Sequence, residues 1–227
     1  MAIIDIKNLK KTYNDSDVPV HAVNGVDLTF EKGEFAAIVG PSGSGKTTLL
    51  NLLGGLDNVT EGEIIINGVN VNELKGSKLI NFRLMNIGFV FQAYNLIPVL
   101  TARENVEFIM ELQKRSSQER KARSEALLKA VGLGDRMHSR PSKLSGGQQQ
   151  RVAVARALAP KPMFILADEP TANLDSASTE NLLDIMERLN SEEQITFIFS
   201  THDSRVVKKA RRVITFEDGK VLSDKTK

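Results

Sequence analysis

The stretch Gly40-Pro41-Ser42-Gly43-Ser44-Gly45-Lys46-Thr47 matches the phosphate-binding pattern G-x-x-x-x-G-K-[ST]. It follows the apolar run 35–39, which predicts a buried strand, and precedes residues 48–53, which predict the start of a helix. A glycine-rich loop between a strand and a helix is the context that this motif requires. The glycines let backbone N–H groups converge on a phosphate, and the helix N-terminus directs its positive end at the same anion. We therefore expect this loop to bind a nucleoside triphosphate.

Individual residues of the loop have expected roles. Lys46 is expected to reach the β- and γ-phosphates, and the hydroxyl of Thr47 to bind Mg²⁺. The residues expected to contact the nucleotide here are Gly40, Ser42, Gly43, Ser44, Gly45, Lys46, Thr47 and Thr48. The alternative interpretation is a glycine-rich turn with a surface lysine, which the flanking strand and helix disfavour.

The composition limits the class of protein. The chain has 227 residues, enough to bury a substantial core, and 30 Lys+Arg balance 28 Asp+Glu, so nucleic acid is not expected as a partner. It has no cysteine, which excludes disulfides and thiolate metal sites. The N-terminus lacks an apolar core of signal length, and the longest apolar runs fall far short of the ~20 residues of a membrane helix. We expect a soluble protein that would reach a membrane only through a partner.

Further strands are predicted on both sides of the phosphate loop. The apolar runs 87–91, 163–167 and 195–200 are typical of interior parallel strands that are covered on both faces. Extended segments and hairpin turns elsewhere predict an antiparallel β-region; they are residues 3–9, residues 22–30, the turn Asn67-Gly68 and the turn 217–219.

The middle of the chain is helical in its pattern. Thr101 with Glu104, and Ser116 with Glu119, form capping-box patterns at the start of two helices. A third helix is expected from about residue 145 to residue 159. The predicted fold is α/β, with a phosphate-loop NTPase core, an antiparallel β-subdomain and a helical subdomain inserted at about residues 95–150. We expect residues 1–227 to form a single domain.

The predicted strand 163–167 is followed by Asp168-Glu169-Pro170. Ligands of parallel sheets bind beyond the carboxyl ends of the strands, so both acids are expected to face the phosphate loop. Asp168 is suited to Mg²⁺, directly or through water, and Glu169 is suited to orient and deprotonate an attacking water. The alternative is an acidic turn that closes the strand.

The stretch Leu144-Ser145-Gly146-Gly147-Gln148, the signature stretch, is a second potential anion site, because a serine and two glycines expose N–H groups at a helix N-terminus. Taken alone, it could be only a helix cap. Its order with the phosphate loop, Gln92, the acids 168–169 and Ser200-Thr201-His202-Asp203 resembles that of the ATP-binding cassette (ABC) ATPases. The resemblance covers essentially the whole chain.

The resemblance implies an ATPase in which two copies pair head to tail, with two ATP at the interface. Each signature stretch then closes on the γ-phosphate held by the other copy. The residues implied to contact ATP, besides the phosphate loop, are Tyr13 on the adenine ring, Ser145, Gly146, Gly147, Gln148 and Asp175. Gln92 is implied to sense Mg²⁺ and the attacking water, and His202 to contact the γ-phosphate. We interpret His21 and His138, which lie outside any motif, as structural.

Residues 92–106 resemble more closely the lipoprotein-releasing, macrolide-exporting and cell-division-associated cassettes. This implies integral membrane permease subunits as partners and a cytoplasmic position on the inner face of the membrane. Residues expected in a permease-binding groove, or alternatively in the core, are Tyr94, Leu96, Ile97, Pro98 and Leu100. Two further alternatives are the ATPase of an amino-acid importer and a soluble cassette protein that drives no transport.

Overall fold

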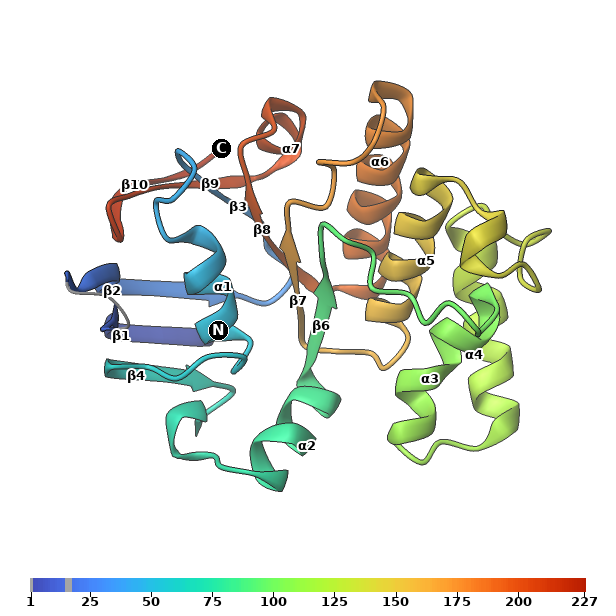
Figure 1. Cartoon of the computed structure of the whole chain (residues 1–227), viewed down its shortest axis with the longest axis horizontal. Coiled ribbons are helices and arrows are strands. Elements are labelled where there is room, and N and C mark those ends of the chain that lie inside the picture. Colours follow the sequence, from blue (N-terminus) through green and yellow to red (C-terminus); the bar gives the residue numbers. More distant parts are fainter. Residues whose placement is uncertain (1, 15–17) are drawn as a thin grey trace.

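The computed structural model describes residues 2–14 and 18–227 (Figure 1). Within these residues, one sheet has six strands in the order β10-β9-β3-β8-β7-β6. Neighbouring strands from β9 to β6 are parallel, and β10 is antiparallel to β9. The strand bounds are β3 (Phe35–Val39), β6 (Ile87–Val90), β7 (Phe164–Asp168), β8 (Thr196–Thr201), β9 (Arg212–Glu217) and β10 (Lys220–Thr226).

The central strands are buried because helices and a second sheet cover their two faces. Successive residues of β3 point to opposite faces. Phe35 and Ala37 pack with α5 (Gly146–Leu158) and α6 (Ser176–Glu193), whereas Ala36 and Ile38 pack with α1 (Lys46–Leu53) and the second sheet. The uniformly apolar pattern of this strand follows from burial on both sides.

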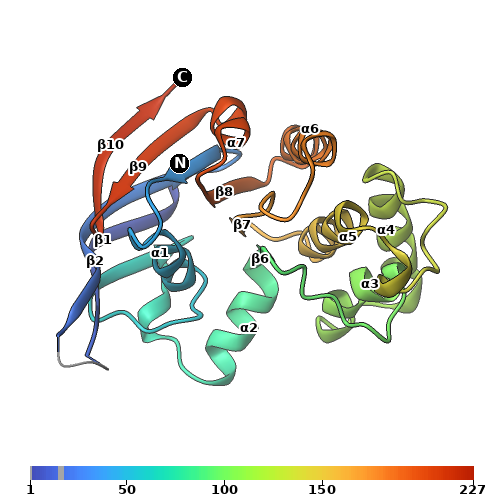
Figure 2. The ribbon, with the colours of Figure 1, turned by 45° about the horizontal axis from the view of Figure 1, so that its top comes forward.

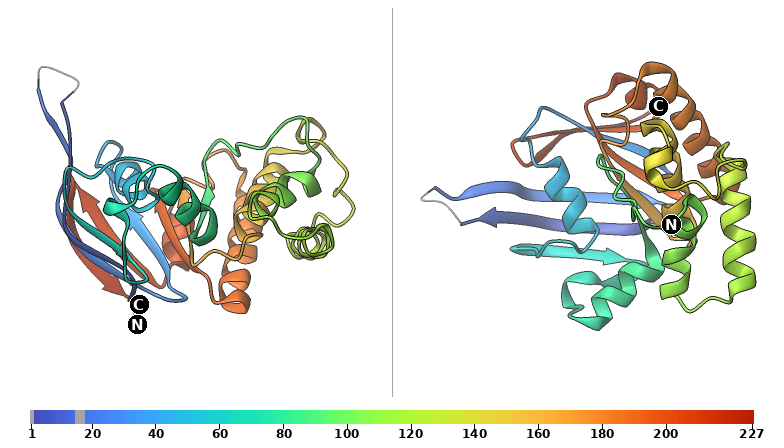
Figure 3. Two further views of the ribbon diagram at one scale, coloured as in Figure 1. Left: turned by 90° about the horizontal axis from the view of Figure 1, so that it is seen from below. Right: turned by 45° about the vertical axis from the view of Figure 1, so that its right-hand side comes forward.

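The described residues form a second, four-stranded sheet with the order β2-β1-β4-β5. Its strands are antiparallel, as predicted, and are β1 (Ala2–Tyr13), β2 (Val20–Glu31), β4 (Glu61–Ile66) and β5 (Val69–Asn70). The two long strands β1 and β2 project together beyond the body of the molecule (Figure 3). Their far ends carry Tyr13 and Val20 to the edge of the site described below.

The helices α3 (Ala102–Leu112) and α4 (Ser117–Ala130) fall inside the predicted helical insertion and lie to one side of the sheets (Figure 2). The predicted capping boxes at Thr101 and Ser116 are both confirmed, and Ser145 forms a third one with Gln148. Apolar residues of α3 and α4 pack against α5 and join the core on that face of the sheet.

Further helices are α2 (Ser77–Asn86) and α7 (Ser204–Lys209), with short 3₁₀ turns η1 (Val71–Glu73) and η2 (Pro141–Lys143). The helices α2, α6 and α7 were not predicted from the sequence. No residue of α2 is fully buried, and only Leu79 and Phe82 pack partly buried against the core. None of the helices in residues 2–14 and 18–227 is both long and apolar enough to cross a bilayer.

Candidate nucleotide-binding site

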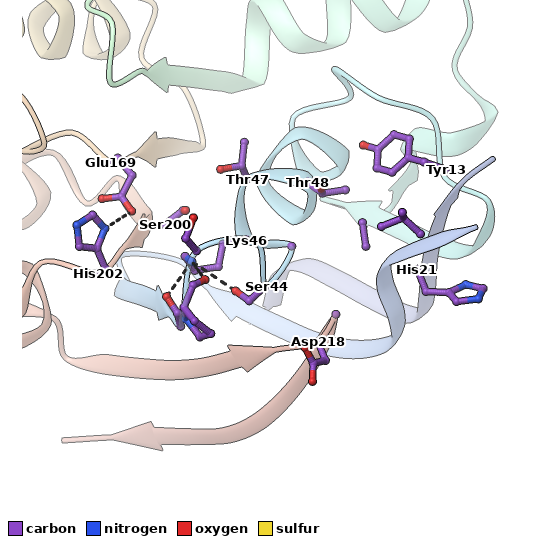
Figure 4. A pocket seen from close by; sticks show the side chains of 18 of the residues that line it. Tyr13, His21, Ser44, Lys46, Thr47, Thr48, Glu169, Ser200, His202 and Asp218 are labelled. Atoms are coloured by element: carbon purple, nitrogen blue, oxygen red, sulfur yellow. Dashed lines mark hydrogen bonds and ion pairs between the residues drawn. The ribbon is translucent and has the colours of Figure 1, made fainter. Parts of the chain in front are cut away.

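A cavity of about 940 Å³ lies where β3, β7 and β8 end (Figure 4). It brings together residues that are far apart in the sequence. Of the predicted site residues, those lining the cavity are Tyr13, Gly40, Ser42, Gly43, Ser44, Gly45, Lys46, Thr47, Thr48, Gln92, Glu169 and His202. The two sheets thus place the phosphate loop, the predicted catalytic acid and the predicted adenine platform around one space.

The phosphate loop passes between two backbone segments. A Cβ atom on Gly40 would lie 1.9 Å from the carbonyl oxygen of Phe216, and one on Gly45 would lie 2.0 Å from that of Ala22. No residue with a side chain fits either position. The Nζ of Lys46, whose residue is 8% exposed, donates to the carbonyls of Gly40 at 2.9 Å and Pro41 at 2.7 Å. The ammonium group is therefore held inside the loop, beside the expected phosphate position.

Thr47 and Asp168 meet at the first turn of α1. The hydroxyl of Thr47 lies 3.0 Å from each carboxylate oxygen of Asp168, and Gln92 lines the same cavity. Hydroxyl, carboxylate and amide oxygens are the ligands that Mg²⁺ prefers. The donor set fits a magnesium ion.

Glu169 is anchored at the end of β7 by β8. Its backbone N–H donates to the carbonyl of Ser200 at 2.9 Å, and its carboxylate lies 2.8 Å from Nδ1 of His202 and 3.2 Å from Oγ1 of Thr201. Its φ of 45° is in the left-handed region, which is unfavourable for a glutamate and often occurs at functional sites. His202 is largely exposed, so its ring reaches into the cavity from the rim.

The signature stretch lies elsewhere. Ser145 caps α5 and its backbone N–H donates to the Gln148 side chain at 2.9 Å. The two glycines allow close packing, because a Cβ on Gly146 would lie 2.8 Å from the hydroxyl of Tyr94 and one on Gly147 would lie 3.0 Å from Oγ of Ser178. The residues Ser145, Gly146, Gly147 and Gln148 do not line the cavity.

Asp175 is also outside the cavity lining, at the N-cap of α6. Its carboxylate accepts from the Ser178 hydroxyl at 2.7 Å and from the Ser178 N–H at 2.9 Å. These hydrogen bonds lower the pKa of Asp175. The structure therefore divides the predicted nucleotide contacts into an assembled cavity and a separate surface at the N-termini of α5 and α6.

The family assignment follows from comparison with known proteins. Residues 23–172, about two thirds of the chain, match the family model described as "ABC transporter". The chain belongs to the ABC transporter family.

This ABC cassette is similar along nearly its whole length to several relatives. It is 49% identical over 98% of its length to a macrolide export ATP-binding/permease protein, MacB, of Hyphomonas neptunium, and this match covers 34% of MacB. It is 46% identical to the uncharacterized ABC transporter ATP-binding protein MJ0796 of Methanocaldococcus jannaschii, covering 96% of this chain and 95% of MJ0796. The cassette thus spans about a third of the length of MacB and nearly all of MJ0796.

The fold comparison agrees. A dimeric structure of MJ0796 in a post-hydrolysis state, bound to ADP and Pi, matches the cassette with a TM-score of 0.90 and 44% identity, over 98% of each chain. The predicted α/β phosphate-loop NTPase fold with its cassette-specific additions is confirmed.

Two residues that line the cavity of the cassette, Ser200 and His21, were not predicted from the sequence as part of the site. Ser200 is fully buried and lines the cavity, and its hydroxyl has no hydrogen-bond partner among the described residues. His21, interpreted above as structural, lies on the cavity wall with Nδ1 3.0 Å from Oγ1 of Thr12. Only the pairing of β1 with β2 brings it there, so no local pattern could have indicated this position.

Asp203 ties two loops of the site together. Its carboxylate accepts from the Thr171 hydroxyl at 2.9 Å and forms an ion pair with Arg205 at 2.8 Å. The hydrogen bond from Arg205 is the main cause that lowers the pKa of Asp203 to about 2. Thr171 lies in the loop that leads from Glu169 to Asp175, so this contact fixes the path between the cavity and the N-terminus of α6.

A second, mostly apolar cavity of about 400 Å³ lies among α2, β6, α3 and α5. Of the residues expected in a permease-binding groove, Ile97 lines this cavity. Leu96 instead packs against the core, which was the alternative interpretation, and Tyr94 contacts the signature stretch. Arg156 of α5 donates to the backbone carbonyl of Tyr94 at 2.8 Å and to that of Asn95, so the segment after Gln92 is held against α5.

Proposed function

We propose that this cassette is the ATP-binding and ATP-hydrolysing subunit of a membrane transporter of the export or lipoprotein-releasing type. One observation carries the proposal: a single cavity joins a phosphate loop and a carboxylate held by a histidine, and Thr47 of that loop lies 3.0 Å from both carboxylate oxygens of Asp168, which gives an oxygen donor pair for Mg²⁺. This combination is what hydrolysis of a nucleoside triphosphate requires.

In the proposed mechanism, the Lys46 ammonium exchanges the carbonyls of its own loop for the β- and γ-phosphates. Thr47, Asp168 and Gln92 would hold Mg²⁺, which would neutralise phosphate charge. Glu169 accepts a proton from the attacking water while His202 and Thr201 fix the direction of its carboxylate.

We propose that the second copy supplies the rest of the site. The signature stretch exposes its N–H groups at the start of α5, outside the cavity of its own chain. A head-to-tail pair would place the signature stretch against the γ-phosphate of the other copy, and would place Asp175 at the interface between the two copies. The dimeric form of MJ0796 with ADP and Pi supports this arrangement.

We further propose a permease as partner, with the cassette at the inner face of the membrane. The name of MacB describes both an ATP-binding and a permease function, and the cassette matches only 34% of its length. The apolar cavity beside Ile97 is suited to an apolar segment of such a permease. These relatives favour export over the amino-acid importer and over a protein without transport function.

The variant Glu169→Gln tests the catalytic assignment. ATP turnover should fall about 100-fold to 10,000-fold, since the general base is removed, whereas ATP binding should persist. The trapped ATP should stabilise the dimer, which light scattering after gel filtration would detect. The control is Glu192→Gln, an exposed residue of α6. Turnover of Glu169→Gln at the wild-type rate would show that the assignment is wrong.

A further inference from the structure

Asp57 lies in the loop that joins α1 to β4, next to Tyr13, the predicted adenine platform. Its Oδ2 accepts a hydrogen bond from the Tyr13 hydroxyl at 2.6 Å, and its Oδ1 accepts one from Nζ of Lys11 at 2.7 Å. Hydrogen bonds from a hydroxyl or an ammonium to a carboxylate are short and strong. Both carboxylate oxygens are therefore committed to residues of β1.

Lys11 and Tyr13 are two residues apart on β1, so their side chains leave the strand on the same face. The Nζ of Lys11 lies 4.7 Å from the centre of the Tyr13 ring, a cation–π distance, and also donates to the carbonyl of Asn58 at 2.8 Å. Lys11 is 9% exposed. A buried ammonium is stable only when it has such partners, and here the ring of Tyr13 is one of them.

The carboxylate of Asp57 keeps its negative charge in this cluster. Burial raises the pKa of Asp57, but hydrogen bonds from Lys11, Tyr13 and Asn58 outweigh it and hold the pKa below the ordinary value. The carboxylate is therefore ionised at neutral pH, when it holds the Tyr13 hydroxyl most strongly.

The position of Asp57 links the two ends of the cavity. The helix α1 begins with Lys46 in the phosphate loop and ends at Leu53, and Asp57 follows four residues later. Figure 4 shows Tyr13 on the far side of Thr47 and Thr48 from Glu169 and His202. The same helix thus bears the phosphate-binding groups at its start and, shortly after its end, the carboxylate that holds Tyr13.

We propose that Asp57 and Lys11 are positioning residues that hold the ring of Tyr13 as the platform for the nucleobase. The inference rests on the proposed function, because it requires that the cavity binds a nucleotide. It goes further in assigning the positioning of the Tyr13 ring to Asp57 and Lys11, which lie apart from the phosphate-binding groups. The cluster should affect binding of nucleotides but not of a ligand that has phosphates and no base.

The test compares the Kd of ATP with that of inorganic triphosphate, each with Mg²⁺, by titration calorimetry. In Asp57→Asn, ATP should bind about tenfold more weakly, the size expected for losing a charge-assisted hydrogen bond, while triphosphate binding is unchanged. Tyr13→Phe keeps the ring and removes the hydroxyl, so it should weaken ATP selectively too. It replaces Asp57→Asn as the test if that variant does not fold.

Glu61→Gln is the matched control. Its ion pair with Lys10, at 2.7 Å, also joins β1 to β4 but has no contact with Tyr13, so both affinities should remain at the wild-type value. In the Tyr13→Ala background, Asp57→Asn should have no further effect on ATP, because no ring remains to be positioned.

Two results would overturn the inference: an equal loss of ATP and triphosphate affinity in Asp57→Asn, or full additivity with Tyr13→Ala. A wild-type protein that bound neither ligand would instead refute the proposed function, so the two failures can be told apart.

Discussion

The phosphate loop and the signature stretch are both glycine-rich segments at a helix N-terminus, but their surroundings differ. The phosphate loop lines a cavity together with residues of β1, β2 and β8 and with Glu169, which follows β7. The signature stretch caps its own helix and contacts Tyr94 and Ser178, but none of its glycines lines that cavity. The first is an assembled site within one chain, and the second is an anion-binding element without a site of its own.

This difference explains how one chain can require a second copy. The exposed N–H groups of the signature stretch can bind an anion, but the stretch has no anion site within its own chain. The assembled cavity supplies that anion when it holds a triphosphate. Substitutions in the phosphate loop should therefore weaken nucleotide binding by a single chain. Substitutions in the signature stretch should weaken pairing of the two copies instead.

The largest expected effect is that of Lys46→Ala on nucleotide binding. The affinity for ATP should fall at least about 100-fold, because a nearly buried ammonium beside the phosphates is removed. Fluorescence titration with an ATP analogue would measure it, and circular dichroism would verify the fold. Lys78→Ala, on the exposed face of α2, is the control. Unchanged affinity would mean that the phosphates bind elsewhere.

Ser145→Asp should affect pairing without affecting binding by one chain. Aspartate is as good an N-cap as serine, so α5 should remain stable, but its charge would repel the partner's γ-phosphate. The ATP affinity of Ser145→Asp should stay within about twofold of wild type. When Ser145→Asp is combined with Glu169→Gln in one chain, gel filtration should no longer detect the ATP-dependent dimer that Glu169→Gln forms alone.

Ser116→Asp is the matched control, because Ser116 caps α4 with the same capping box but belongs to no predicted nucleotide contact. This variant should retain the dimer. Mixing Ser145→Asp with Lys46→Ala, each in an otherwise wild-type chain, should restore ATP hydrolysis, because one composite site of the mixed pair is intact. If mixing restores nothing and Ser145→Asp alone binds ATP poorly, the signature stretch serves its own chain.

Contiguous motifs explain why much of the site could be predicted from the sequence. The phosphate loop, the acids 168–169 and residues 200–203 each lie at the carboxyl end of a strand, and parallel strands bring these ends to one edge. The capping boxes at Thr101 and Ser116 were likewise readable, because side chain and backbone partner are only three residues apart.

What the sequence could not indicate depends on contacts between distant segments. Asp57 meets Tyr13 only because β1 pairs with β4, and His21 reaches the cavity only because β2 pairs with β1. The helix α6 did carry a readable pattern, with Leu182, Leu183 and Met186 buried at helical spacing, but it was missed. The positions of Asp57 and His21 thus depend on tertiary contacts, whereas α6 was missed because its periodicity was overlooked.

Substitution of Asp203 has the smallest expected effect, and it tests the connection between the cavity and the N-terminus of α6. Its pKa of about 2 lies below the ordinary 3.8, so the ionised carboxylate stabilises the folded state at neutral pH. This contribution should be complete above about pH 5 and decline as the pH falls through 3.8 toward 2. Asp203→Asn can still cap α7 and accept from Thr171, so it removes mainly the charge.

At pH 7 this variant should lose about 1.5 to 3 kcal/mol of unfolding free energy in urea, the usual range for a hydrogen bond to a charged group. Near pH 2.5 the gap to wild type should be clearly smaller, because this carboxyl is then protonated in the unfolded chain and in part also in the folded chain. Asp135→Asn, at a largely exposed carboxylate, should show no gap at either pH. A gap of equal size at both pH values would mean that Asp203 acts through packing rather than charge. The loop from Glu169 to Asp175 would then not depend on the ion pair with Arg205, and the path between the cavity and α6 would have to be fixed by the backbone alone.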